Sequence, residues 1–398
     1  MRKIPTVLMG SQCRRLVSLI LLSKSYGISH QSAAKPEKGL TPEQLVHSED
    51  TSCLGALSEN IACSSPIPKK KFAILMAYCG LGYYGMQMNR SRPDLPTIES
   101  TLMSALVEAH CVPEMIEKRQ LRFQRCARTD KGVSALGQVV SLRLLTSCTN
   151  PVEKINSSLP PEIRIIDIKR VTKGFSSKNM CDGRSYSYMV PTFALSKYAP
   201  SIPDSRFRLP RDDFHQVNSF LSFYKGTHNF HNFTTKTSSD DPSAWRHIFD
   251  ISCSEPFVHH GIEFAYINVT GHSFMLYQIR KMVGLIIAVT KGVVTSDLIP
   301  QCVQIDKVNI PPAPGLGLVL ESVYYERYNR RYGGDGVHQE LKWEESLPFV
   351  ASFREKKIIP VILNGELDNF SMTYWLDHIK KHNFIGFNTY RDLLCSHA

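Results

Sequence analysis

The sequence lacks an apolar run long enough to cross a bilayer. The longest such run near the N-terminus covers residues 16–22 and is interrupted by Ser18, whereas a transmembrane helix needs about 20 residues. No later stretch is a better candidate. An integral membrane protein is therefore excluded.

Cysteines are present, but they lack the spacing of a structural site. The chain has 11 Cys in 398 residues, and the nearest two, Cys53 and Cys63, are ten residues apart. Zinc ribbons need C-x-x-C pairs, and disulfide frameworks are typical of short secreted chains. We therefore predict reduced, intracellular thiols. His228 and His231 stand at i, i+3 without acidic or cysteine partners nearby, so we predict packing roles for them and no metal site.

Acidic residues are scarce relative to basic ones. Lys and Arg number 47 against 36 Asp and Glu, and the segment from residue 337 onward holds 7 and 8 of them, respectively. The first 336 residues therefore carry 40 basic and 28 acidic side chains, an excess of +12. Such a body favours a polyanionic partner, most commonly nucleic acid. A merely solvated basic surface is the alternative.

The N-terminus contains no acid before Glu37, six basic residues and six serines within residues 1–36. This composition predicts a mitochondrial presequence, with a disordered basic tail as the alternative. Residues 37–70 are rich in Ser, Pro, Glu and Lys and are predicted to form a disordered linker. The lysines at 69–71 are a weak nuclear signal.

Hydrophobic periodicity begins at Phe72. Strands are predicted at 72–78, 139–144, 163–166, 185–190, 264–269 and 316–324, and helices at 98–109, 214–224 and 273–291. Thr97 is placed to cap the first helix. The pattern predicts an α+β fold with a mainly antiparallel sheet, in an N-terminal half (71–195) and a C-terminal half (196–335). Aromatic residues suggest that residues 336–398 form a packed extension; these are Trp343, Phe349, Phe353 and Trp375.

The densest polar signal is the loop at 125–132, where one carboxylate, Asp130, lies among Arg125, Arg128 and Lys131. Cations within about 4–6 Å hold a carboxylate ionised, which suits a nucleophile or a base. From spacing alone, a surface loop with an ion pair is the alternative. No P-loop motif is present, and no cofactor is predicted.

Residues 127–135, Ala-Arg-Thr-Asp-Lys-Gly-Val-Ser-Ala, resemble the signature of the tRNA pseudouridine synthase A family, whose bacterial form reads G-R-T-D-A-G-V-H-A. Their flanks resemble the eukaryotic pseudouridylate synthase 1 branch. Further segments similar to that family follow in order across residues 72–335, at 82–87, 184–188, 225–233, 271–284 and 313–318.

The resemblance implies the pseudouridine synthase fold, in which two pseudo-twofold-related halves share a mixed sheet crossed by a basic RNA cleft. It implies the cofactor-free isomerisation of uridine to pseudouridine, mainly at anticodon-stem uridines of tRNA and also in small nuclear and messenger RNA. It further implies a monomer, because the C-terminal extension covers the surface through which bacterial relatives dimerise. With the N-terminal composition, we expect a mitochondrial enzyme, with the nucleus as a second compartment.

The resemblance also assigns catalytic roles. Asp130, in the loop 125–135, matches the aspartate that attacks the substrate covalently, and Arg280 matches the basic residue that pairs with it. Tyr186 matches the tyrosine that stacks on the target uracil and assists proton transfer. We expect Gly284, one helical turn after Arg280, to allow close approach to the nucleophile loop.

Substrate-binding roles are assigned to four more residues. Arg128 matches an arginine that enters the RNA helix and helps to displace the target nucleotide. Lys131 and Arg184 stand in matched motifs, and Tyr188 is the fallback for Tyr186.

Two other functions compete with this reading. A non-catalytic RNA-binding or tRNA-folding factor would need the basic cleft but not Asp130 and Arg280, and both are present. A hydrolase acting on small nucleosides would not need so broad a basic surface.

Overall fold

The computed structural model describes residues 69–114, 118–200, 202–304 and 307–384. The expected presequence and nearly all of the expected linker lie outside the described residues. The linker boundary at residue 70 is wrong by two residues, because strand β1 (Lys69–Tyr78) begins at Lys69 and pairs from there with Leu145.

Within the described residues, the strands form one ten-stranded sheet in the order β4-β1-β3-β10-β5-β9-β7-β6, with β2 beside β3 and β8 beside β9. All pairings are antiparallel except that of β10 with β3. The predicted mainly antiparallel α+β fold is confirmed. The remaining strands are β2 (Gln124–Arg125), β3 (Ser134–Leu145), β4 (Ile163–Arg170), β5 (Gly183–Pro191), β6 (Gly226–Asn229), β7 (Trp245–Cys253), β8 (Phe257–His259), β9 (Ile262–Gly271) and β10 (Leu318–Tyr324).

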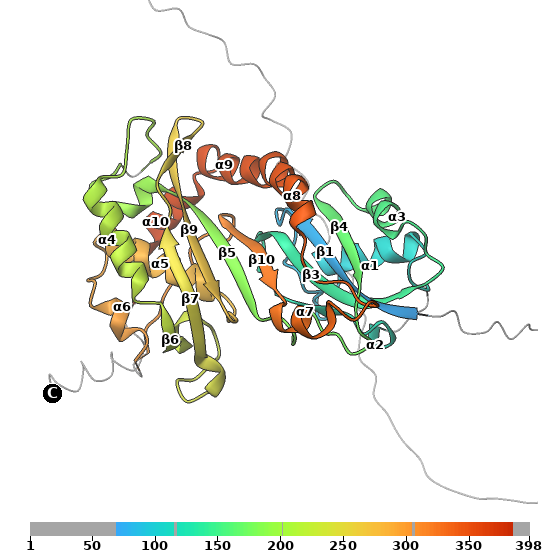
Figure 1. The fold of residues 1–398 in the computed structure, drawn as a ribbon. Helices are drawn as coiled ribbons and strands as arrows, with labels where there is room; N and C mark the ends of the chain where they lie inside the picture. Colours follow the sequence, from blue (N-terminus) through green and yellow to red (C-terminus); the bar gives the residue numbers. More distant parts are fainter. Residues whose placement is uncertain (1–68, 115–117, 201, 305–306, 385–398) are drawn as a thin grey trace, which may run out of the picture. The chain divides into compact units, whose positions relative to one another are not determined.

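Helices pack on both faces of this sheet (Figure 1). Helix α1 begins after Thr97, which confirms the predicted cap, and the side chains of Thr97 and Ser100 form a capping box there. No helix in the described ranges is long and apolar enough to cross a membrane. The helices are α1 (Ile98–Glu108), α2 (Lys118–Leu121), α3 (Pro151–Ser158), α4 (Arg211–Ser222), α5 (Gln278–Thr290), α6 (Leu298–Gln301), α7 (Glu326–Tyr332), α8 (Leu347–Phe353), α9 (Ile359–Leu367) and α10 (Ser371–Ile379).

The C-terminal extension packs on the sheet. Phe353, Ile358 and Ile362 form a hydrophobic cluster with side chains of five strands, Ala77, Leu136, Met189, Phe264 and Val319. Figure 1 shows α8 and α9 running along the sheet from β4 towards β8. Phe349, which the sequence reading grouped with the packed aromatics, is 44% exposed.

The helix predicted from residue 273 begins five residues later, at Gln278. Two features prevent the helix from beginning earlier. Tyr277 adopts a left-handed conformation (φ 64°), and the side chain of Gln278 accepts a hydrogen bond from the Met275 N–H at 2.9 Å. Side-chain bonds of this kind compete with helical backbone bonds. Residues 273–277 are consequently free to line the cleft described below.

The expectation for Gly284 is also wrong in its detail. A Cβ atom at this position would lie 2.4 Å from the Pro311 carbonyl oxygen and 3.3 Å from the Ala313 nitrogen. The close approach therefore brings α5 against residues 311–313 and not against the loop that carries Asp130.

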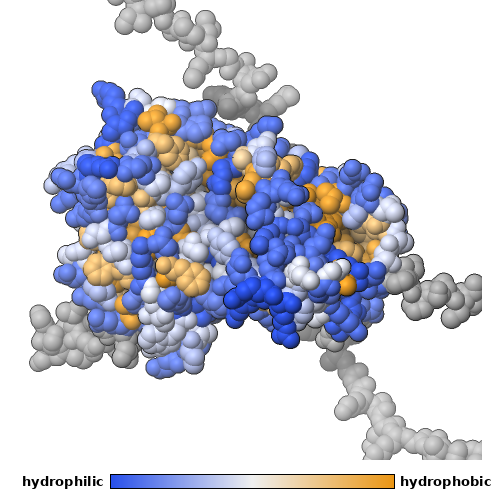
Figure 2. Space-filling model, in the orientation of Figure 1, coloured by the Kyte–Doolittle hydropathy of each residue, from blue (hydrophilic) through white to orange (hydrophobic). Residues whose placement is uncertain are grey.

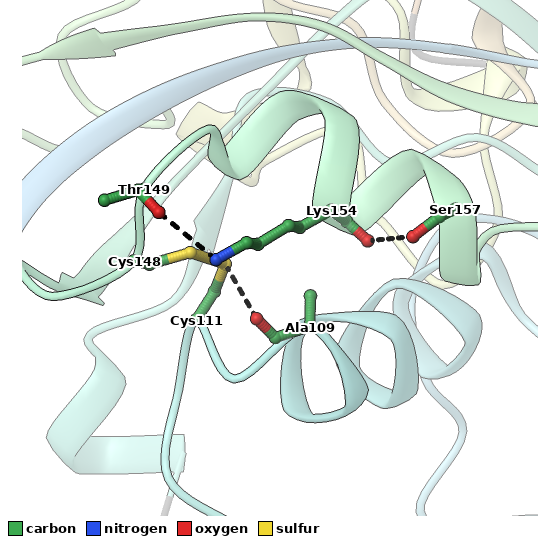
Figure 3. The surroundings of a disulfide bond; sticks show 6 residues. All are labelled: Ala109, Cys111, Cys148, Thr149, Lys154 and Ser157. Atoms are coloured by element: carbon green, nitrogen blue, oxygen red, sulfur yellow. Dashed lines mark hydrogen bonds between the residues drawn. A yellow bond between two sulfur atoms is a disulfide. The ribbon is translucent and has the colours of Figure 1, made fainter.

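The prediction that all thiols are reduced does not hold for Cys111 and Cys148, which form a disulfide with their Cα atoms 5.4 Å apart. The pair joins the end of α1 to the connection between β3 and α3, where Lys154 also reaches Thr149 (Figure 3). The two cysteines are 37 residues apart in sequence, so no spacing rule finds them. Tertiary folding brings them together.

One motif escaped the sequence reading. Residues 80–85, after β1, have the glycine spacing G-x-G-x-x-G of a dinucleotide-binding loop. That function needs a βαβ unit with parallel strands, whereas β1 pairs only antiparallel with β3 and β4. The glycines serve a different purpose, which is described with the site.

Candidate active site

A cleft of about 590 Å³ lies between the two halves of the sheet. The loop 123–130 lines it from the N-terminal half, and residues 273–280 line it from the C-terminal half. Arg184 and Tyr186 of β5 and Leu318 of β10, from adjacent central strands, also line it. Five of the residues predicted from the sequence thus line one cavity, namely Asp130, Arg128, Arg184, Tyr186 and Arg280.

Asp130 and Arg280 form an ion pair across this cleft. The Arg280 Nη1 atom donates to Asp130 Oδ2 at 3.1 Å, and the side chains are 15% and 14% exposed, respectively. The Nε atom of Arg280 donates to the Ala313 carbonyl at 2.7 Å, and its guanidinium lies 5.4 Å from the centre of the Tyr277 ring. The arginine is therefore held in place and presents one end to the carboxylate.

The electrostatics of Asp130 differ from the sequence prediction. Arg125 instead pairs with Glu99 at 2.8 Å, and the Lys131 amine lies over the Tyr84 ring at 4.3 Å. Burial raises the pKa of Asp130, and the opposing effects of Arg280 and Arg128 do not cancel that rise. Of the three cations near Asp130 in the sequence, only Arg128 contributes to its pKa; burial and Arg280, 150 positions away, have the larger effects.

The loop before Asp130 is held by buried polar side chains. Gln138 donates to the Ala127 carbonyl at 2.9 Å, the Tyr78 hydroxyl lies 2.9 Å from Thr129 Oγ1, and Arg184 donates to the Cys126 carbonyl at 2.8 Å. The Arg184 guanidinium also donates to the His272 carbonyl at 2.7 Å. Arg184, predicted to bind substrate, thus ties the loop of one half to the strand end of the other.

The turn after β1 packs against the loop that carries Asp130, and a glycine allows this close approach. Gly85 has φ +91°, and a Cβ atom there would lie 2.5 Å from the Thr129 carbonyl oxygen. The Met86 N–H donates to that oxygen at 3.1 Å. Gly82 also has a positive φ, +84°, but a Cβ atom there would meet nothing within 4 Å.

These two glycines provide a matched test. Gly82→Ala should lower the free energy of unfolding by about 1–2 kcal/mol, the cost of the left-handed conformation. Gly85→Ala adds a backbone clash beside Asp130, so we expect a larger loss of stability and a lower turnover. Denaturant unfolding and activity of both variants measure this. Equal behaviour of the two would show that the turn does not position the loop.

Tyr186 and its fallback Tyr188 occupy different environments. Tyr186 lines the cleft, with its ring edge-on to Phe274 at 5.3 Å. Tyr188 is 1% exposed, does not line the cleft, and donates its hydroxyl to the Pro314 carbonyl at 2.8 Å. Burial raises the pKa of both tyrosines, so their hydroxyls remain protonated at neutral pH. Only Tyr186 is placed to contact a ligand.

The sequence reading missed several cleft residues. Phe274 faces Tyr186, and Arg246 and Lys178 add positive charge to the cleft from β7 and from the segment before β5. Burial lowers the pKa of Arg246. Phe274 lies in the segment 271–284 that resembles the family, whereas nothing in the sequence around Arg246 or Lys178 distinguishes them from other basic residues. Among the described side chains, no group of three or more His, Cys, Asp or Glu could hold a metal ion.

Comparison with known proteins agrees with the resemblance. A profile of the family described as tRNA pseudouridine synthase matches residues 221–326. The pseudouridylate synthase 1 homolog of Mus musculus is 51% identical over 322 residues, covering 80% of this chain and 76% of that protein, and the Homo sapiens homolog is 51% identical over 313 residues, covering 78% and 73%. The tRNA pseudouridine synthase 1 of Yarrowia lipolytica is 32% identical over 386 residues, covering 75% and 72%. With this similarity over most of its length, the chain belongs to the tRNA pseudouridine synthase family.

Proposed function

We propose that Asp130 is the nucleophile with which this enzyme converts uridine in tRNA to pseudouridine. The ion pair between Asp130 and Arg280 at 3.1 Å, inside a cleft lined by both halves, carries this proposal. In the isomerisation the bond between N1 and C1′ breaks and the bond between C5 and C1′ forms. The hydrogen on C5 leaves as a proton, and N1 gains one, so the reaction is balanced without a co-reactant.

The other cleft residues support that step. Arg280 stabilises the ionised carboxylate that a nucleophile requires, and its bond to the Ala313 carbonyl fixes its direction. Tyr186 offers its ring to the uracil as a stacking surface, a contact worth about 1–3 kcal/mol. Arg128 is exposed at the cleft margin, where it would help to displace the target nucleotide.

Release of tritium tests the activity. Pseudouridine formation expels the C5 hydrogen, so wild-type enzyme should release the label from an unmodified tRNA transcript carrying uridine tritiated at C5. Absence of release, with salt-sensitive tRNA binding intact, would instead support a non-catalytic binding factor. Mapping the modified positions tests the anticodon-stem specificity, and transcripts of small nuclear and messenger RNA test the wider range.

A second prediction separates the two roles assigned to Tyr186. Tyr186→Phe keeps the ring, and the hydroxyl it removes stays protonated and is a poor base. We therefore expect Tyr186→Phe to retain turnover within about tenfold, and Tyr186→Ala to lose more, because stacking is lost as well. Single-turnover rates of both variants measure this. If Tyr186→Phe lost as much turnover as Tyr186→Ala, the hydroxyl would take part in proton transfer.

We propose mitochondria as the site of action, on the basis of the acid-free, Arg- and Ser-containing residues 1–36. The nuclear alternative loses support from the lysines at 69–71, because Lys71 is buried in β1 and donates to the Arg122 carbonyl. Imaging the full chain beside a variant lacking residues 1–36 tests both. Mitochondrial signal that depends on this segment supports the proposal, and nuclear signal from the full chain would overturn it.

We also propose that the enzyme is a monomer. The helices α8 and α9 cover apolar side chains of the sheet that would otherwise be exposed. On the face in Figure 2, hydrophobic residues lie in separate patches among hydrophilic ones, as is typical of monomers. Light scattering of the full chain should give a mass near 45.0 kDa; twice that mass would contradict the proposal.

A further inference from the structure

A second cleft adjoins the catalytic one. It measures about 540 Å³ and shares Gln87, Phe123, Gln124 and Arg125 with the catalytic cleft. Four more basic residues line it, and they come from four separate segments of the N-terminal half: Lys71, Arg90, Arg122 and Lys173. A chain molecule occupying the catalytic cleft can therefore continue into the second one without leaving the protein surface.

The carboxylates that the structure describes do not balance the positive charges lining the second cleft. Glu99 is the one carboxylate among its lining residues, and its Oε2 atom already accepts from Arg125 at 2.8 Å and from the Met88 N–H at 3.0 Å. Within the ranges that the structure describes, Arg90, Arg122 and Lys173 form no ion pair with a carboxylate.

Lys71 makes this excess of positive charge unusual. It is 5% exposed, it stands directly across the β1–β3 ladder from Arg143, and its amine donates to the carbonyl of Arg122. Like charges directly opposite in a sheet are destabilising, and a buried charge is costly without a partner. Burial, together with Arg143 and Arg122, lowers the pKa of Lys71 to about 8. Arg122 itself has φ +50°, uncommon for a residue with a side chain.

We propose that the second cleft binds backbone phosphates of the RNA strand that flanks the target uridine, with Arg122, Lys173 and Arg90 as the contacting residues and Lys71 supporting Arg122 from below. This inference rests on the proposed function, which places the target nucleotide in the catalytic cleft. A phosphodiester chain supplies what the cleft lacks, namely negative charge at regular spacing along a path continuous with Asp130. Phosphate contacts position a nucleic acid without reading its sequence.

Salt dependence of tRNA binding tests the proposal. The variant Arg122→Asn/Lys173→Ser removes two charges, and Asn tolerates the left-handed conformation at 122. The control Lys154→Ser/Lys381→Ser removes two exposed charges outside both clefts. We expect the first pair to weaken binding of an unmodified tRNA transcript about tenfold near 0.1 M salt. We also expect it to lower the slope of log affinity against log salt by about 1.5, since each phosphate contact contributes about 0.7–0.9.

The control should leave the slope within about 0.3 of wild type, because distant charges release no bound counterions. Phosphate-ethylation interference should reveal sites beside the target uridine that disappear in the Arg122→Asn/Lys173→Ser variant. An unchanged slope, or an equal fall in the control, would overturn the proposal. Binding is read independently of tritium release: an enzyme that releases no tritium but shows the slope change would overturn the proposed function alone.

Discussion

Replacing Asp130 by Asn is expected to abolish tritium release while leaving tRNA affinity within a few-fold of wild type. Asn has nearly the shape of Asp, but its amide cannot act as a nucleophile, so we expect turnover to fall by about 10⁴-fold or more. Affinity should persist because Asp130 is not among the residues that we propose to contact the RNA phosphates. Single-turnover tritium release and filter binding of one tRNA transcript measure the two quantities.

The same substitution makes a prediction about stability. Burial raises the pKa of Asp130, so its ionised form opposes folding, and its ion pair with Arg280 offsets only part of this cost. Asp130→Asn removes the cost of burying the carboxylate but leaves Arg280 without its carboxylate partner, so we expect the free energy of unfolding to fall by less than the about 3–5 kcal/mol of a broken buried pair. Asp130→Ala serves as a second inactive variant. Turnover by either variant within tenfold of wild type would exclude Asp130 as the nucleophile.

Replacing Arg280 by Met is expected to lower turnover nearly as much as Asp130→Asn does, and also to lower the free energy of unfolding. Met fills similar volume without charge, which leaves the mostly buried Asp130 carboxylate without its partner. Removing one member of a buried ion pair costs about 3–5 kcal/mol, and at neutral pH we expect a loss near the lower end of that range. The pKa of Asp130 should rise further, because Arg280 lowers it in the wild type, so less of the enzyme holds an ionised nucleophile.

The pH dependence of the Arg280→Met variant has a definite sign. The folded-state pKa of Asp130 then lies well above its value in the unfolded chain, so the stability penalty is present above the folded-state pKa. It diminishes as the pH falls through that pKa. We therefore expect the difference in stability from wild type to shrink on acidification, whereas the residual activity should rise with pH.

A double variant provides the control for this pair. Asp130→Asn/Arg280→Met removes both charges, and it should recover most of the stability lost in Arg280→Met without recovering activity. Thermal unfolding from acidic to neutral pH compares the four proteins. If the double variant were as unstable as Arg280→Met, the guanidinium would act through its bond to the Ala313 carbonyl and not through Asp130.

The sequence alone indicated the family, the α+β class and the residues that later meet in the cleft. Local patterns located residues 72–78 of β1 from their apolar run, and the start of α1 from period-four spacing and the cap Thr97. They failed at residues 273–277, because one left-handed residue and one side-chain hydrogen bond overrode an apolar pattern.

Only the tertiary structure decided which partner each charged side chain contacts. Three cations stand within five residues of Asp130, yet Arg125 pairs with Glu99 and Lys131 lies over the Tyr84 ring. The ion-pair partner of Asp130 is Arg280, which is 150 residues away in the sequence. The direction of the Asp130 pKa follows burial, which no sequence neighbour reveals. Residue types specify the available chemistry, but desolvation and distance depend on the packing of the whole chain, and these set how the carboxylate can react.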